Sequence, residues 1–265
     1  MNMRTLVESM GFRSRFWNVA SKLFGGKRDL YQSLGYLREL TPADYRARFY
    51  RNAVANRVVK ALPKATWRGG MEIVEDQDPT VETAFEAAVI DLYHRLKKST
   101  GLGIEQVLEQ ADILAGIGRY SVILIGAPGE LDTPLEHAGP EEIVYLTPYA
   151  EEDALVQSYV TDNKDARFGL PAFYTVNRTT MTSATAINSA NVGRKVHWSR
   201  IIHIAEGNLD DRVFGEPRLQ CVWNLLDDLE KVTGGGAEAF WRRADRGMQF
   251  DLDPTLKVEQ PEKDE

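Results

Sequence analysis

Apolar residues return every three to five positions in several stretches of this chain, a pattern that predicts helices with one buried face. The predicted helices cover residues 4–24, 41–62, 78–100 and 104–116, and a helical period returns from Pro217 until Gly234–Gly236 interrupts it. A shorter helix is expected after these glycines, over residues 237–246.

Two of these helices carry sequence signals at their ends. Thr41 is expected to cap the second helix, Pro42 suits its first position, and Pro63 is expected to end it. A short strand should follow over residues 66–75. The predicted buried face of this helix consists of Tyr45, Phe49, Val54, Val58 and Leu62.

The third helix is expected to begin at residues 78–80 and to end at Gly101. Its buried face is predicted to consist of Val81, Phe85, Val89, Leu92 and Leu96.

The apolar period changes after the fourth helix. Residues 119–126 are almost continuously apolar, which predicts a buried central strand. Further short strands are expected at 143–150, 154–161, 172–177, 195–204 and 247–253. Turn-forming residues separate the first four of these strands, and a polar loop is expected over 177–194, so the pattern predicts an α+β fold with a mixed or antiparallel sheet flanked by helices.

Charge is distributed unevenly along the 265 residues. The net charge is −7, but residues 1–60 carry +8 (12 Lys and Arg against 4 Asp and Glu) and the rest carries −15. A chain this acidic is not a general nucleic-acid binder, because duplex binding depends on clustered Lys and Arg. No apolar run is long enough for a membrane span, and no secretory signal is recognisable. The single cysteine, Cys221, cannot form an intramolecular disulfide.

The stretch HWSRIIHI, residues 197–204, raises the question of catalysis or metal binding. If it is one continuous strand, His197, Ser199 and His203 project from the same face. The two histidines would then lie ~20 Å apart, too far to share a metal ion. The geometry therefore favours a structural role, and no metal or other cofactor is expected.

Other possible sites are equally unspecific. The glycines of GIGRYSV precede a strand, whereas a dinucleotide-binding turn follows one. The GGGAEAF segment lacks the Lys-Ser/Thr of a phosphate-binding loop, and Asp227 and Asp228 point in different directions on a helix. The sequence therefore favours a structural or assembly protein over an enzyme.

Five segments occur in an order that resembles the portal proteins of tailed bacteriophages, particularly portal-like proteins related to anti-CBASS families. These segments are RNAVANRVVKALPKATWRGG, ADILAGIGRYSVILIG, FGLPAFYTVN, VHWSRIIHIAEG and VFGEPRLQCVWNLLDDLEKV. In that family, His-x-Ser-Arg followed by Ile or Val and another apolar pair marks a strand that leads to a Gly-x-Pro-x-Leu helix start. The matching residues here are His197, Ser199, Arg200, Ile201 and Ile202, then Gly215, Pro217 and Leu219. The resemblance covers roughly residues 36–255.

The resemblance implies a wing-like portal domain over residues 36–215, after a basic arm at 1–35. Residues 216–265 would be a helical segment leading toward a stem region that this chain does not contain, because portals are usually longer. Arg200 is expected to bond nearby carbonyl or carboxylate groups.

The implied function is structural: one subunit of a ring, twelvefold in the family, at a capsid vertex through which DNA is packaged and ejected. The implied partners are copies of the chain, the major capsid protein, a head-tail adaptor, the terminase and double-stranded phage DNA in transit. The protein is expected in the virion, and in the host cytoplasm during assembly, without a membrane partner.

Two sets of residues are predicted to make contacts in such an assembly. Trp198, Arg200 and Trp241 are expected at subunit interfaces, and the basic N-terminal residues are expected to contact DNA, an acidic neighbouring subunit or capsid protein. The basic residues are Arg13, Arg15, Lys22, Lys27 and Arg28. A solvated basic face remains the alternative for the arm.

The alternative function is a phosphodiesterase that acts on cyclic nucleotide signals, as in some relatives of this family. Such enzymes need two His-x-Ser/Thr motifs, and only His197-Trp198-Ser199 fits.

Overall fold

The computed structural model describes residues 29–71, 73–75, 83–136, 138–177 and 193–244. The chain divides into two compact units, Met1–Trp223 and Asn224–Glu265, which are treated separately below. The helix predicted at 4–24 and the strand predicted at 247–253 lie outside the described residues.

The first three helices of the described residues are capped at their N-termini by side chains. A short helix, α2 (Leu30–Leu34), precedes α3 (Pro42–Arg51) and α4 (Ala53–Thr66). As predicted, Thr41 caps α3: its hydroxyl accepts from the Asp44 amide, and the Asp44 carboxylate accepts from the Thr41 amide. The prediction of a single helix over 41–62 is wrong, because Asn52 is extended and its side-chain oxygen caps a second helix, α4.

The break at Asn52 changes which residues of α4 are buried. Tyr45 and Phe49 are buried as predicted, but Val54 and Leu62 are exposed, and the residues buried in α4 are instead Ala55, Val59 and Pro63. Pro63 lies inside α4 rather than ending it, and Trp67–Gly69 forms a 3₁₀ turn, η1, where a strand was predicted.

The next two helices follow the predicted periods more closely. α5 (Ala84–Thr100) begins after Thr83, whose side chain forms a capping box with Glu86, and Gly101 ends it with a φ of 76°. Leu92 and Leu96 are buried, but the prediction for Phe85 is wrong: it lies in the first turn and is 46% exposed. α6 (Ile104–Ile117) confirms the helix predicted over 104–116, and it buries Ile104, Val107 and Ala111.

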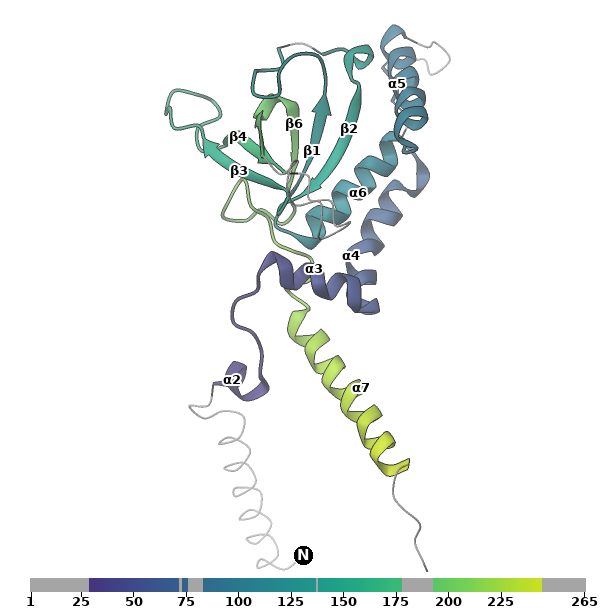
Figure 1. Cartoon of the computed structure of the whole chain (residues 1–265), viewed down its shortest axis with the longest axis vertical. Coiled ribbons are helices and arrows are strands. Elements are labelled where there is room, and N and C mark those ends of the chain that lie inside the picture. Colours follow the sequence, from purple (N-terminus) through teal and green to yellow (C-terminus); the bar gives the residue numbers. More distant parts are fainter. Residues whose placement is uncertain (1–28, 72, 76–82, 137, 178–192, 245–265) are drawn as a thin grey trace, which may run out of the picture. The chain divides into compact units, whose positions relative to one another are not determined.

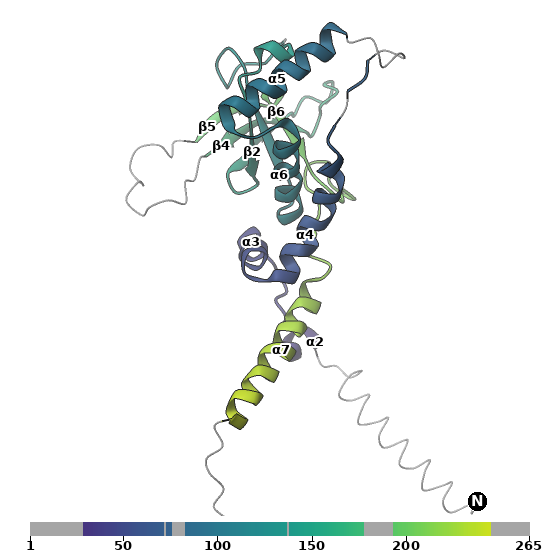
Figure 2. The ribbon, with the colours of Figure 1, turned by 90° about the vertical axis from the view of Figure 1, so that its right-hand side faces the viewer.

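In the described ranges, six strands form two three-stranded sheets, and all pairs are antiparallel (Figures 1 and 2). One sheet has the order β2-β1-β6 and the other β3-β4-β5. The strands are β1 (Ser121–Gly126), β2 (Tyr145–Ala150), β3 (Ala154–Tyr159), β4 (Pro171–Val176), β5 (Arg194–His197) and β6 (Ile201–Ile204). The α+β class predicted from the sequence is confirmed.

Strand β1 is the centre of the packing, and this explains its nearly uninterrupted apolar sequence. Val122 and Leu124 point to one face and pack with buried residues of the second sheet, such as Tyr174 and Val196. Ile123 points to the opposite face and packs against α6. A strand covered on both faces has no solvent side for polar residues, as the sequence predicts.

The C-terminal helix, α7, runs over Trp223–Ala244 without interruption. The prediction that Gly234–Gly236 breaks it is wrong, and the helix begins at Trp223 rather than near Pro217, which precedes a series of turns at 218–222. Among the described residues, no helix is long and apolar enough to cross a membrane.

Candidate functional site

The HWSRIIHI stretch is a crossover between the two sheets. β5 ends at His197, a 3₁₀ turn, η3, spans Trp198–Arg200, and β6 begins at Ile201 in the other sheet. The prediction of one continuous strand is therefore wrong, because the chain must turn to leave one sheet and join the other. His197 and His203 lie on strands of different sheets.

His197 and Ser199 form a local cap. The His197 Nδ1 atom lies 2.8 Å from Ser199 Oγ and accepts from the Ser199 amide at 3.3 Å. The Leu135 amide donates to the same Oγ at 2.7 Å, so the hydroxyl proton is directed to Nδ1. Burial, together with the positive charges of Arg167 and Arg200, lowers the pKa of His197. This neutral imidazole ends strand β5 and orders the following turn.

His203 is a polar element of the core. Its Nε2 donates to the Val213 carbonyl at 2.7 Å, and its Nδ1 lies 3.1 Å from the Tyr174 hydroxyl. The Tyr120 ring stacks on it with 4.8 Å between centroids. Burial lowers the pKa of His203, so both ring nitrogens serve a neutral hydrogen-bond network. Within the described ranges, no group of His, Cys, Asp and Glu is placed to hold a metal ion.

Arg200 is the most unusual side chain of the crossover, because it is only 2% exposed. Its guanidinium donates to three backbone carbonyls of one loop: Thr133 at 3.0 Å, Ala127 at 3.1 Å and Pro128 at 2.9 Å. A Cβ at Gly129 would lie 2.8 Å from Arg200 Nη2, so the loop closes tightly on this group. The expectation that Arg200 bonds nearby carbonyls is confirmed.

A second arginine, Arg218, fixes the segment that leads to α7. Its Nε donates to Glu206 at 2.7 Å, its Nη2 to Asp112 of α6 at 2.6 Å, and its Nη1 to the Val59 carbonyl of α4 at 2.9 Å. The Arg218 pKa is raised: burial opposes the shift, and the hydrogen bonds to Glu206 and Asp112 outweigh it.

The glycine and leucine of the Gly-x-Pro-x-Leu pattern have clear structural roles beside this arginine. A Cβ at Gly215 would overlap the Glu206 carbonyl oxygen, and Leu219 is completely buried. Sequence reasoning found this pattern but missed Arg218, Asp112 and Glu206. Nothing in their spacing signals an ion cluster, because they come from three separate segments.

Trp223, the last residue of the first unit, is held by α3. The Arg48 guanidinium lies 3.8 Å from the centroid of its ring and donates to its carbonyl at 3.0 Å. Tyr45 meets the same ring edge-on at 5.4 Å. Cation–π and edge-to-face contacts of this kind favour one ring position, so the Trp223 ring is fixed to α3.

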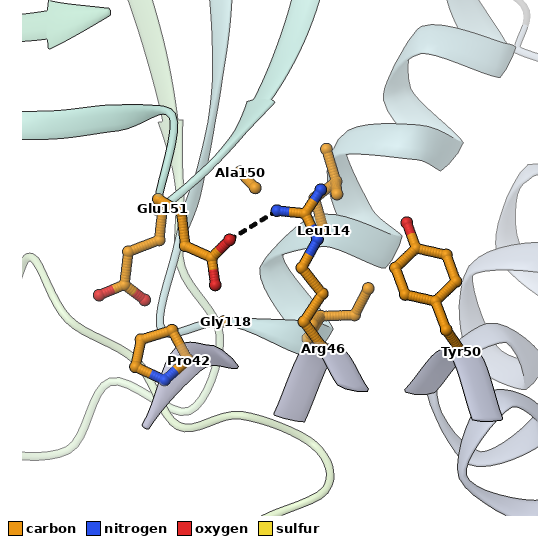
Figure 3. A pocket seen from close by; sticks show the side chains of 9 residues that line it. Pro42, Arg46, Tyr50, Leu114, Gly118, Ala150 and Glu151 are labelled. Carbon is orange, nitrogen blue, oxygen red and sulfur yellow. Dashed lines mark hydrogen bonds and ion pairs between the residues drawn. The ribbon is translucent and has the colours of Figure 1, made fainter. Parts of the chain in front are cut away.

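A small pocket lies where α3 approaches α6 and the turn after β2 (Figure 3). Pro42, Arg46 and Tyr50 line it from α3, and an ion pair of 2.6 Å joins Arg46 to Glu152. Figure 3 shows the Arg46 guanidinium extending along the pocket toward this carboxylate. Leu114 and Ala150 make the rest of the lining largely apolar. The pocket offers no nucleophile paired with a base, as acyl- or phosphoryl-transfer chemistry would need.

The predicted contact residues lie in different parts of the molecule. Trp198 is half-buried, with the Arg167 guanidinium 3.5 Å from the centroid of its ring, whereas Trp241 on α7 is 78% exposed. Arg200 is enclosed by its loop, so any effect on an interface would be indirect. Arg13, Arg15, Lys22, Lys27 and Arg28 lie outside the described residues. The assignment of these residues to interfaces stays a prediction.

Within the part that the structure describes, buried polar residues order loops and junctions, and no catalytic constellation occurs. The family model described as "Phage portal protein" matches residues 44–264. The chain therefore belongs to the phage portal protein family, which confirms the resemblance found in the sequence. No curated protein sequence matches the chain.

Solved structures with a similar fold come from gene transfer agent (GTA) particles. One, from the virion of a native GTA particle, has a TM-score of 0.51 at 15% identity and covers 89% of this chain and 56% of its own. Another, from the neck of an empty GTA particle computed with C6 symmetry, has a TM-score of 0.53 at 17% identity and covers 80% and 48%. The chain thus spans about half the length of these structures.

Proposed function

We propose that this chain is one subunit of a closed ring at a capsid vertex, through which DNA enters the particle during packaging and leaves it during ejection. The observation that carries this proposal is the portal family match over residues 44–264. The proposal is also supported by the similarity of this fold to a chain in the neck of an empty GTA particle, which was computed with C6 symmetry. Twelve copies per ring is the number that the family resemblance implies.

The negative net charge of the chain is compatible with a channel through which DNA passes. Its net charge is −7, and residues 61–265 carry −15. A negatively charged wall disfavours phosphate binding, so DNA can pass without being held. The positive charge of residues 1–60 is then available for a partner other than the moving DNA, such as the acidic surface of a neighbouring copy.

The partners follow from the position of such a ring. Copies of the chain lie on both sides, the major capsid protein surrounds the ring, and a head-tail adaptor and the terminase bind it at different stages. Assembly takes place in the host cytoplasm, and the finished ring is part of the virion. Arg13, Arg15, Lys22, Lys27 and Arg28 are proposed to contact an acidic neighbour, capsid protein or packaged DNA.

The phosphodiesterase alternative receives no support from the site. Ser199 and His197 hydrogen-bond to each other and to backbone amides, and His203 is engaged with Tyr174 and Val213. A second His-x-Ser/Thr motif, needed to grip one phosphate from two sides, is missing from the sequence.

Electron microscopy and mass measurement of the purified protein test the proposal. We expect rings with a central hole and a mass that is a multiple of the 29.8 kDa chain. Monomers under every condition, with no ring in particles, would contradict it.

The contribution of the basic arm is tested by repeating the mass measurement at low and high salt, with Arg13→Glu and Arg15→Glu as variants. Exposed charge pairs are screened by salt, so rings held by the arm should weaken in high salt and in the variants. A ring that is insensitive to both would keep the portal function and exclude the electrostatic role.

A further inference from the structure

The outer face of the second sheet, β3-β4-β5, carries a row of aromatic and basic side chains. Phe173 and His197 lie opposite each other on β4 and β5, and Lys195 is two residues from His197, so the three share one face. Tyr174 and Val196 form the next opposite pair and belong to the buried core, so they occupy the other face. The row is therefore turned away from the core of its own unit.

Each member of the row contacts the next one. The Lys195 Nζ atom lies 3.8 Å from the centroid of the Phe173 ring, and that ring meets His197 edge-on with 5.3 Å between centroids. The centroids of His197 and Trp198 are 5.5 Å apart, and the Arg167 guanidinium lies 3.5 Å from the centroid of the Trp198 ring. We call these five residues the β5 row. Cation–π contacts restrict the two charged side chains, so little conformational entropy is lost when they bind a partner.

The two cations of the β5 row have no acidic partner within the described residues. Neither Lys195 nor Arg167 forms an ion pair there. The Arg167 Nη2 donates to the Pro171 carbonyl at 3.1 Å, and its buried Nε has no hydrogen-bond partner in the described part of the chain. Residues 171–205 contain four Lys and Arg and no Asp or Glu, although the whole chain has 39 Asp and Glu among 265 residues. This face therefore stays basic in an acidic protein.

The backbone of β5 is open along one edge. β5 is the last strand of its sheet (Figure 2). The His197 amide donates to the Leu131 carbonyl at 2.8 Å and so points away from β4. Amides two residues apart in a strand point the same way, so the Lys195 amide is directed to this outer edge. In the described ranges, no segment outside the sheet accepts from the Lys195 amide. Such an edge can pair with an added extended segment.

We propose that the β5 row binds an extended acidic segment of another protein. Carboxylates of the segment pair with Lys195 and Arg167, its apolar side chains lie on the rings between them, and its backbone pairs with the outer edge of β5. The charge of the row and the open edge favour a peptide, because duplex DNA needs many clustered cations and has no backbone that continues a sheet. The inference goes beyond the proposed ring, since it concerns one face of a single subunit.

Fluorescence anisotropy of labelled probes with the purified full chain tests this inference. The main probe is a short peptide in which Glu and Val alternate, and the matched neutral probe has Gln in place of Glu. We expect saturable binding of the Glu peptide, roughly tenfold weaker binding of the Gln peptide, and weaker binding of the Glu peptide at high salt. A lack of binding by the Glu peptide, or equal binding of both peptides, would overturn the inference.

Two further probes separate the proposed segment from other occupants. One is short duplex DNA, and the other is a peptide with an acidic sequence of this chain, VEDQDPTVE, residues 74–82. The second should bind less tightly than the Glu peptide, because Pro79 has no amide to donate to a strand edge. Tighter binding of DNA would identify a nucleic-acid site, and tighter binding of the chain's own sequence would identify a contact between copies. Either result contradicts the proposal.

Charge reversal tests the position of the site. Lys195→Glu should weaken binding of the Glu peptide by roughly tenfold. The matched control is Lys164→Glu, which reverses an exposed lysine of the loop between β3 and β4 and changes the net charge equally. It should leave binding unchanged. Equal losses in the two variants would show general electrostatic attraction and would rule out a site at the β5 row.

Hydrogen exchange with the Glu peptide bound gives a second readout. Amides of β5 should become protected, whereas those of β2, an edge strand of the first sheet, should not. Protection of both strands, or of neither, would be contrary to the proposed edge pairing. None of these measurements requires a ring. A ring that forms while the Glu peptide fails to bind would leave the proposed function intact, and specific binding without a ring would leave this inference intact.

Discussion

The crossover at residues 197–204 and helix α7 use polar and apolar side chains in opposite ways. At the crossover, Arg200 is buried and its guanidinium donates to three carbonyls of one loop. On α7, large apolar side chains are exposed, and ion pairs between neighbouring turns occupy the polar side. The crossover satisfies its polar groups within one chain, whereas large apolar side chains of α7 stay exposed.

This difference separates what the subunit needs to fold from what it needs to assemble. A buried guanidinium must have its hydrogen bonds before the loop around it can close, because unpaired buried polar groups are costly. An exposed apolar helix face costs little in the isolated chain, but its burial stabilises an assembly. Substitutions in the two regions should therefore separate folding from ring formation.

The largest expected effect is at Arg200. Arg200→Leu leaves the carbonyls of Ala127, Pro128 and Thr133 without their donor, and we expect a loss of about 3–5 kcal/mol in the free energy of unfolding. Urea denaturation measures this value. Arg212→Leu, at an exposed position, is the control and should change stability by less than about 0.5 kcal/mol. Equal effects would show that the Arg200 network does not stabilise the fold.

Gly215→Ala should have the next largest effect. Its Cβ would overlap the Glu206 carbonyl oxygen, so the segment before α7 must shift, at a cost of about 2–3 kcal/mol. Gly69→Ala is the matched control, because nothing lies within 4 Å of the added Cβ. Thermal melting of the two variants should differ clearly. If Gly215→Ala melts at the wild-type temperature, the close approach of Gly215 to the Glu206 carbonyl is contradicted.

The histidines should make stability depend on pH. Burial lowers the pKa of His203 below 6.5, so the unfolded chain binds this proton more readily than the folded chain. Stability is then complete above pH 6.5 and falls as the pH decreases below it. His203→Gln, which retains a donor and an acceptor, should show a weaker decrease between pH 7 and pH 5 in urea titrations. An unchanged pH dependence would exclude His203 as its source.

The smallest effect concerns the glycine triplet. Gly235→Ala should stabilise α7 by about 0.8–1 kcal/mol, because alanine has the higher helix propensity and the added methyl group meets no atom of this chain. Amide hydrogen exchange in α7 should slow by roughly four- to fivefold where exchange follows local opening. A faster exchange would mean that the helix requires glycine at this position for its own conformation.

The sequence predicted the elements that depend on local signals. The Thr41 cap, the Gly101 stop and the apolar strand at 121–126 each follow from a few neighbouring residues. The wrong predictions concern two helix boundaries, because one local signal was missed and another did not act as expected. Asn52 interrupts a period that looks continuous, and Gly234–Gly236 remain helical although glycine usually weakens a helix.

The site was predicted less completely for the same reason. The structural role of the His197 stretch could be inferred, because no catalytic partner occurs at a suitable spacing. The sheet switch at Trp198–Arg200 could not, since a 3₁₀ turn between two strands leaves no periodic signal. Arg218 pairs with Glu206, 12 positions away, and with Asp112, 106 positions away, and such a cluster is visible only in three dimensions.

Hydrogen exchange of the protein before and after ring assembly tests the central claim most directly. The account predicts that amides of β1 and β6 exchange slowly in both states, because their contacts lie within one chain. Amides of α7 should exchange fast in the free subunit and become protected only in the ring. Equal protection of α7 in both states would contradict the expectation that ring formation, and not its own unit, protects this helix.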